Sequence, residues 1–271
     1  METIAKDQYY KIDRYFEWMY NTYKRFIGKN VLDIGVGFGT MTQYYVKDAD
    51  IVIAVDLSEK RLAFVKERFR DYNVVTKVLN IESDDASSLR EYEIDTIVCT
   101  NVIEHIQDDL KAVINMKNAL SPGGRIIIMV PAIPSLYNDF DRNAGHLRRY
   151  GKGQLAELAQ NADLNIIYQR YINILGVIPY RLKGKRNSKK GGRIEQAKKT
   201  GCSTHINERY SKLYNLATCI LEPVEKIVSV PFGLSELIVP KKQDINTEKL
   251  ENEDEVITEK NCQKGDYKTE A

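Results

Sequence analysis

The sequence predicts an α/β protein with a mostly parallel sheet that is covered by helices on both faces. Two observations carry this prediction. Short apolar, β-branched segments alternate with segments of helical periodicity at short spacing, which is the pattern of βαβ units. One of these apolar segments, residues 30–34, runs directly into three glycines at alternate positions. Glycine can adopt positive φ and leaves room for a ligand, so this run indicates a strand that turns tightly into a helix.

The expected elements follow one another in chain order. An aromatic amphipathic helix comes first, at residues 8–27, and its side chains are expected mostly to cover the sheet, although Tyr15, Trp18 and Met19 could instead touch a ligand. The expected strands are residues 30–34, 51–56, 74–79, 94–99, 125–130, 165–173 and 233–240. Between them we expect helices at residues 40–47, 58–69, 108–120, 152–161 and 206–229, and a basic loop at residues 181–193.

Composition limits the classes of protein that fit this chain. It has 271 residues, a net charge of +2 and 43% hydrophobic residues, which suits either one large domain or one domain with an appendage. Nearly balanced charge argues against a protein that binds nucleic acid by bulk charge. We find no signal peptide and no apolar run that approaches a membrane span, so we expect a cytoplasmic protein with reduced cysteines.

The glycine turn predicts a nucleoside site. Gly35, Gly37 and Gly39 are followed by Thr40, whereas a dinucleotide fingerprint carries its third glycine at the position of Thr40. This spacing weakens the pyrophosphate interpretation and favours a nucleoside ligand without a phosphate chain. A nicotinamide-dependent oxidoreductase is therefore the less favoured alternative.

Polar residues at the ends of the expected strands extend this site, because the carboxyl ends of parallel strands meet at one edge. Asp56 ends the second strand and can accept both hydrogen bonds of a ribose diol. Asp33 precedes the glycines, where it can bind a ligand ammonium directly or through water. The third and fourth strands are followed by candidate contacts to an adenine ring and to the transferred group: Asn80, Ile81, Asn101 and Val102.

These motifs resemble those of class I S-adenosylmethionine-dependent methyltransferases. The resemblance rests on residues 31–40, on Asp56 and on the segments 99–106 and 120–131, in that order along the chain. It implies a Rossmann-like, seven-stranded sheet with an antiparallel last strand, and S-adenosyl-L-methionine as cofactor with S-adenosyl-L-homocysteine as product. The implied cofactor contacts are Asp33, Gly35, Gly37, Gly39, Thr40, Asp56, Leu57, Asn80, Ile81, Asn101 and Val102. Asn80 departs from the pattern, since relatives often carry Asp there.

The resemblance also divides the chain. We expect an N-terminal helical lid at residues 1–29, a cofactor-binding core at residues 30–175 and a basic, helical insertion at residues 176–232 that can build the acceptor site. A last strand at residues 233–240 and a disordered charged tail at residues 241–271 follow. Within the family, the chain is most similar to a bacterial subgroup that carries a Gly-His-x-Arg-Arg-Tyr segment after the fifth strand. This segment is residues 145–150 here.

Candidates for the acceptor half are fewer. Methyl transfer needs alignment and, for a hydroxyl or a protonated amine, a base. His105 is the first candidate, with Glu104 to orient it, and His146 is the second; alternatively, the Glu-His pair only caps the turn before the next helix. Arg148 and Arg149 could bind an acidic acceptor, or one of them could pair with Asp139 or Asp141 and order the loop.

Metal binding is not predicted. In ubiquinone-pathway O-methyltransferases a similar Glu-His segment helps to hold a divalent metal, but the further carboxylate of such a site cannot be identified in this sequence.

The predicted function is S-adenosylmethionine-dependent methyl transfer to oxygen or nitrogen of a small or lipid-linked metabolite. A catalytically silent scaffold with the same fold is the alternative. Residues 181–230 could contact an anionic membrane or form a solvated loop, which fits a protein that is cytoplasmic or peripheral to the inner face of the membrane. Nucleic acid is not an expected partner, since the chain lacks the Asn/Asp-Pro-Pro-aromatic motif of base methylation.

Overall fold

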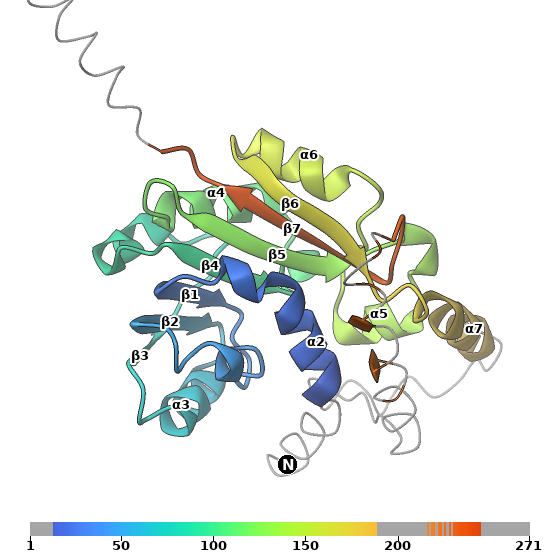
Figure 1. Ribbon diagram of the computed structural model, residues 1–271, viewed down its shortest axis with the longest axis horizontal. Helices are drawn as coiled ribbons and strands as arrows, with labels where there is room; N and C mark the ends of the chain where they lie inside the picture. The colour runs from blue at the N-terminus through green and yellow to red at the C-terminus, as the bar shows by residue number, and fades with distance from the viewer. Residues whose placement is uncertain are drawn as a thin grey trace, which may run out of the picture.

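A computed structural model describes residues 13–188, 216, 218, 219, 222, 223, 225, 228 and 230–244. Its centre is a seven-stranded sheet with the order β3-β2-β1-β4-β5-β7-β6 (Figure 1). Strands β1 to β5 pair in parallel, and β7 runs antiparallel between β5 and β6. This confirms the predicted sheet and its antiparallel last strand. The strands are β1 (Asn30–Ile34), β2 (Ile51–Asp56), β3 (Val74–Val78), β4 (Thr96–Thr100), β5 (Arg125–Pro131), β6 (Asn165–Ile172) and β7 (Ser235–Lys241).

Helices cover both faces of the sheet, as predicted. Alternate residues of the central strands enter two separate hydrophobic cores, which explains why these strands are almost continuously apolar. One core holds α4 (Asp109–Ala119) and α6 (Gln154–Asn161), and the other holds α2 (Asp13–Tyr23) and α3 (Glu59–Arg68). In α2, Trp18, Met19 and Tyr23 are buried in the second core, so these side chains cover the sheet.

The starts of two predicted helices are confirmed by their caps. The Ser58 hydroxyl accepts from the backbone N–H of Arg61 at the start of α3, and the Asp108 carboxylate accepts from Lys111 N–H at the start of α4. Each bond satisfies an N–H group that the first turn of a helix leaves without a partner.

Two predicted elements differ from the structure. Residues 40–47 form turns around a short 3₁₀ helix, η3 (Thr42–Tyr44), because the Thr42 and Tyr45 side chains bond Asp33 and neither residue type favours a helix. The predicted basic loop at 181–193 is helical as far as Ser188, within α7 (Val177–Ser188), where Arg, Leu and Lys are good helix formers. Residues 189–215 and 245–271 lie outside the described residues, as do parts of 216–229, and so do the predictions made for them.

A helix that the sequence analysis missed follows β5. It is α5 (Asp139–Ala144), which begins with a capping box between Asn138 and Asp141 and ends at Gly145 with φ 85°. Tyr150 then bridges back to Ala132 at the end of β5, closing the loop that carries α5. Both α5 and α7 lie beyond the carboxyl end of β5 (Figure 1). The remaining short 3₁₀ helices are η2 (Lys24–Phe26), η4 (Ala86–Tyr92), η5 (Ile103–His105) and η6 (Pro134–Leu136).

Candidate active site

The glycine turn after β1 has the geometry that its sequence predicts. Gly35, Gly37 and Gly39 all have positive φ, at 66°, 57° and 72°. A Cβ atom at Gly35 would lie 2.6 Å from the Val102 side chain, and one at Gly39 would lie 2.5 Å from the Phe69 ring. At Gly37 the nearest atom to such a Cβ is 3.9 Å away. Packing thus requires glycine at positions 35 and 39, whereas Gly37 has room for a Cβ and so for the close approach of a ligand.

Asp33 fixes the chain that follows this turn. The side chain is buried, and its Oδ2 accepts hydrogen bonds from the Thr42 hydroxyl at 2.6 Å and the Tyr45 hydroxyl at 2.5 Å. Burial raises the pKa of Asp33 to about 6. Both donors use Oδ2, so Oδ1 is the atom with acceptor capacity left for a ligand.

Asp56 sits where β2 ends and ties this strand to the glycine turn. Its Oδ2 accepts from Gly37 N–H at 3.0 Å and its Oδ1 from Ser58 N–H at 2.9 Å, while Arg61 Nη1 lies 3.5 Å from Oδ1. Each carboxylate oxygen has a further lone pair, which is what the two hydroxyls of a ribose need. The neighbouring Leu57 side chain is 68% exposed, so an apolar surface lies bare beside this carboxylate.

The residues after β3 and β4 complete this edge. The Asn80 side-chain oxygen accepts from Glu82 N–H at 3.0 Å, which stabilises the turn around the buried Ile81. Asn101 has φ 55° and donates its N–H to the Met129 carbonyl oxygen, and Val102 contacts the glycine turn. The fold therefore brings the predicted cofactor residues to the carboxyl edge of β1 to β4; their contacts with a cofactor stay predictions.

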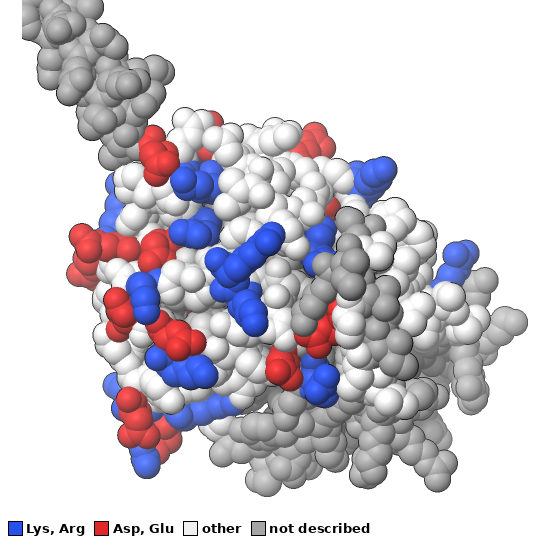
Figure 2. Space-filling model, viewed as in Figure 1, with Lys and Arg blue, Asp and Glu red and all other residues white. Residues whose placement is uncertain are grey.

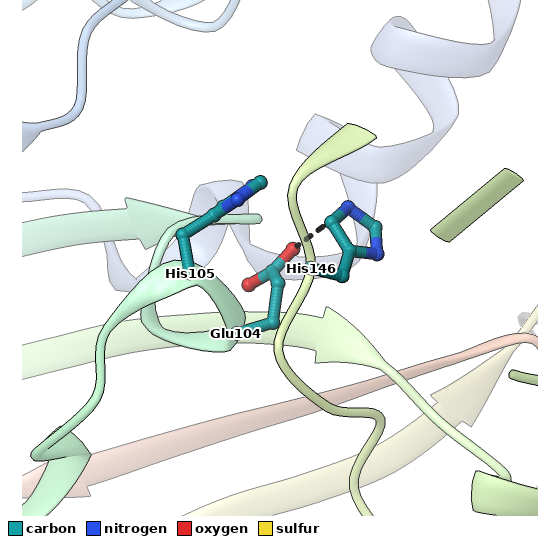
Figure 3. Close-up of side chains that lie close together, drawn as sticks. All are labelled: Glu104, His105 and His146. Atoms are coloured by element: carbon teal, nitrogen blue, oxygen red, sulfur yellow. Dashed lines mark ion pairs between the residues drawn. The ribbon is translucent and has the colours of Figure 1, made fainter. Parts of the chain in front are cut away.

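The three candidate acceptor-side residues also lie together (Figure 3). Glu104 and His105 belong to η5 after β4, and His146 follows α5. The two imidazole rings are 4.8 Å apart, centre to centre, and edge-on, and His146 Nε2 lies 3.9 Å from Glu104 Oε1. Both histidines are candidate bases from the sequence alone, and the structure makes them neighbours.

Glu104 does not orient His105, contrary to the sequence-based expectation. Its side chain is fully buried, and neither carboxyl oxygen has a hydrogen-bond partner among the described residues. Burial raises the pKa of Glu104 to about 8, so the carboxyl holds its proton at neutral pH. His105 Nδ1 instead contacts the Gly145 carbonyl oxygen at 3.0 Å.

A set of charged side chains behind His146 was only partly foreseen. Asp141 is fully buried and lies 3.1 Å from His146 Nδ1, while Arg149 pairs with the same carboxylate at 2.8 Å. Arg148 pairs instead with Asp109, on α4. Both arginines thus have internal carboxylate partners, which supports the loop-ordering alternative for Arg149. The Asn-x-x-Asp spacing at 138–141 was the signal in the sequence that could have identified Asp141.

The cluster of Glu104, His105 and His146 contains residue types that can hold metal ions. One possible ligand atom of each residue, an imidazole nitrogen or a carboxyl oxygen, lies within 4.8 Å of the other two. Carboxyl and imidazole groups at such spacing also serve proton transfer. The absence of a metal therefore stays a prediction.

Comparison with known proteins agrees with this geometry. Residues 32–128 match the family model of a methyltransferase domain. A ubiquinone biosynthesis O-methyltransferase of Coxiella burnetii is 29% identical over 101 residues, which cover 36% of this chain and 42% of that protein. The chain therefore matches less than half the length of the curated relatives.

Solved structures share the fold. An S-adenosylmethionine-dependent methyltransferase from Mesorhizobium loti has a TM-score of 0.53 at 12% identity, covering 83% of this chain and 98% of that one. SpnF, a cyclase, has a TM-score of 0.53 at 16% identity, covering 86% and 81%. Its different chemistry shows that fold alone does not fix a reaction. Residues 32–128 therefore carry a methyltransferase domain, and the sheet order and the glycine turn agree with the fold of the class I S-adenosylmethionine-dependent methyltransferases.

Proposed function

We propose that this protein binds S-adenosyl-L-methionine and transfers its methyl group to an oxygen or nitrogen of a small or lipid-linked metabolite, releasing S-adenosyl-L-homocysteine. The observation that carries the proposal is the arrangement of Asp56 and the glycine turn. Asp56 accepts hydrogen bonds from Gly37 N–H and Ser58 N–H and keeps lone pairs for ribose hydroxyls, beside a glycine at which an added Cβ would meet no clash. Asp33 supplies a buried carboxylate for the ligand ammonium.

The chemistry that the cofactor supplies is a methyl group on a positively charged sulfur, already a good leaving group. The protein has to align the acceptor, exclude water and remove a proton where the acceptor carries one. His105 and His146 are the candidates for proton removal, since they lie together beyond β4 and β5, with the protonated Glu104 carboxyl next to His146.

The acceptor class follows from the relatives and the surface. The ubiquinone biosynthesis O-methyltransferases among the relatives support oxygen as the atom that is methylated. On the face drawn in Figure 2, acidic and basic side chains are interspersed, unlike the one-signed surface that a phosphate backbone attracts. Both observations favour a small acceptor over nucleic acid.

A peripheral contact with the membrane through residues 181–230 would suit a lipid-linked acceptor. The stretch 181–193 carries seven Lys or Arg and no acidic residue. Within the part of the chain that the structure describes, none of the helices has the length and hydrophobicity to cross a bilayer.

Calorimetric titration with S-adenosyl-L-methionine and S-adenosyl-L-homocysteine tests the cofactor half. We expect binding of both, and a loss of at least about tenfold in affinity for Asp56→Ala, because a ribose hydrogen bond to a charged group is worth about 1.5–3 kcal/mol. Asp71→Ala, which removes an exposed carboxylate on a surface turn, is the matched control. No binding, or equal binding by both variants, contradicts the proposal.

A panel of hydroxyl and amine acceptors, assayed by release of S-adenosyl-L-homocysteine, tests the transfer. Turnover with any member supports methyl transfer. Tight cofactor binding without turnover across soluble and vesicle-borne acceptors would favour the silent scaffold. A fluorescence titration with NADH that shows binding at the same site would favour the oxidoreductase alternative.

A further inference from the structure

His146 is held from one side by a buried carboxylate. Its Nδ1 lies 3.1 Å from Asp141 Oδ1, and the Asp141 side chain is fully buried. An ionised carboxylate only accepts hydrogen bonds, so the proton in this contact belongs to Nδ1. The other ring nitrogen, Nε2, is then an acceptor, and it faces Glu104 at 3.9 Å (Figure 3).

The surroundings of Asp141 keep it ionised and fixed. Arg149 Nε and Nη2 each lie 2.8 Å from its Oδ1, and Tyr180 Oη and Asn138 N–H donate to its Oδ2, both at 3.0 Å. Burial by itself would raise the pKa of Asp141, but the hydrogen bonds from His146 and Arg149 hold it well below its usual range. The carboxylate therefore places a fixed negative charge beside the imidazole of His146.

His105 is placed differently. Its Nδ1 contacts the Gly145 carbonyl oxygen, which carries no net charge. Burial and the neighbouring His146 both lower the pKa of His105. A carbonyl stabilises an imidazolium less than a carboxylate does. Of the two histidines, His146 is the one whose Nδ1 contacts a carboxylate and whose Nε2 faces Glu104.

The distance between His146 Nε2 and Glu104 Oε1 suits an acceptor atom that bonds to both. An oxygen about 2.8 Å from both Nε2 and Glu104 Oε1 fits at the apex of a triangle whose base is their 3.9 Å separation. Glu104 lacks a hydrogen-bond partner among the described residues, and an acceptor hydroxyl at this apex would give it one. Leaving a buried carboxyl without a partner costs about 1–3 kcal/mol, which makes this arrangement favourable.

We propose that Asp141 is a positioning residue that holds His146 with Nδ1 protonated and Nε2 free, so that His146 rather than His105 takes the proton of the methyl acceptor. The inference rests on the proposed methyl transfer. In the step, the acceptor proton passes to Nε2 and the electron pair that it leaves forms the new bond to the methyl carbon. The bond between that carbon and sulfur breaks, its electron pair stays on sulfur, and Asp141 stabilises the resulting imidazolium.

Nitrogen NMR of the imidazole side chains tests the positioning without an acceptor. The chain has three histidines, so His105→Gln and His146→Gln variants assign the signals. At neutral pH we expect His146 in the Nδ1-protonated tautomer in the wild type and a mixture of tautomers in Asp141→Ala. Tyr180→Phe, which removes a different contact of Asp141, should leave the tautomer unchanged. A wild-type His146 protonated on Nε2 overturns the proposal.

A rate comparison tests the role of the charge and stays informative where Asp141→Ala does not fold. Asp141→Asn keeps an oxygen toward His146 but removes the negative charge. With an acceptor from the panel, we expect Asp141→Asn and His146→Gln to lower kcat by about 10²–10⁴-fold at unchanged cofactor affinity. His105→Gln should cost less than about tenfold. Equal rates for Asp141→Asn and Tyr180→Phe overturn the proposal, whereas absent cofactor binding refutes the proposed function instead.

Discussion

The two halves of the carboxyl edge of the sheet are built in different ways. At the cofactor half, after β1 to β3, the backbone shapes the site: Gly37 N–H and Ser58 N–H donate to Asp56, and positive φ angles form the glycine turn. At the acceptor half, after β4 and β5, buried charged side chains shape the site, with the ion pair of Asp141 and Arg149 at the centre.

This difference teaches where each half is vulnerable. Backbone groups are present whatever the side chains are, so the cofactor half depends on a few residues that permit the turn. Buried charges depend on every partner, because removing one leaves another without compensation.

Arg149→Met should destabilise the protein by about 3–5 kcal/mol, because it leaves the buried Asp141 carboxylate without its cation. Arg148→Met is the matched control. Its pair with Asp109 is partly exposed, so we expect a loss of about 1 kcal/mol or less. Chemical denaturation at neutral pH measures both. Equal effects would show that the acceptor half is not organised around Asp141.

Gly39→Ala should cost about 2–3 kcal/mol, because its Cβ would lie 2.5 Å from the Phe69 ring and its φ is 72°. Gly37→Ala has the backbone strain without the clash, and about 1 kcal/mol is expected. Relative to the stability that each variant loses, Gly37→Ala should weaken cofactor binding more than Gly39→Ala does, and a cofactor titration measures this. If the loss of cofactor affinity is proportional to the loss of stability in both variants, no ligand lies beside Gly37.

The same contrast explains what the sequence could predict. Asp33, the glycines and Asp56 are local signals, since each follows an apolar strand directly, and the edge where parallel strands end then brings them together. The contact of Asp141 with Arg149 and Tyr180 joins α5, the loop after it and α7, and no periodicity records it. Glu104 was expected to serve His105 because the two are adjacent in sequence, but its buried carboxyl faces His146 instead.

Residues 40–47 show that local sequence signals can also mispredict secondary structure. Their composition allows a helix, yet the Thr42 and Tyr45 hydroxyls donate hydrogen bonds to Asp33, and the segment forms turns around a 3₁₀ helix. A tertiary hydrogen bond thus overrides a weak local preference.

Glu104→Gln should change how stability depends on pH. Because the pKa of Glu104 is raised from 4.5 to about 8 by burial, the neutral carboxyl stabilises the fold fully below about pH 4.5, and this contribution is lost as pH rises through about 8. The variant cannot ionise there, so relative to it the wild type should lose about 1–4 kcal/mol between pH 5 and 9. Denaturation at a series of pH values measures this, with the exposed Glu91→Gln as control. Parallel curves for wild type and Glu104→Gln would mean that Glu104 has a partner that neutralises its charge.

Cofactor affinity should weaken below the pKa of Asp33, which burial raises to about 6. The ionised carboxylate attracts a ligand ammonium and the protonated one does not, so affinity should be constant above about pH 7 and fall by up to about tenfold for each unit below 6. Calorimetry with S-adenosyl-L-homocysteine between pH 5 and 8 measures this. Methylthioadenosine lacks the amino-acid part of the cofactor and is the matched control, whose affinity should not follow this titration. If both ligands lose affinity together, Asp33 acts through its bonds to Thr42 and Tyr45, which shape the turn, and the ammonium contact is wrong.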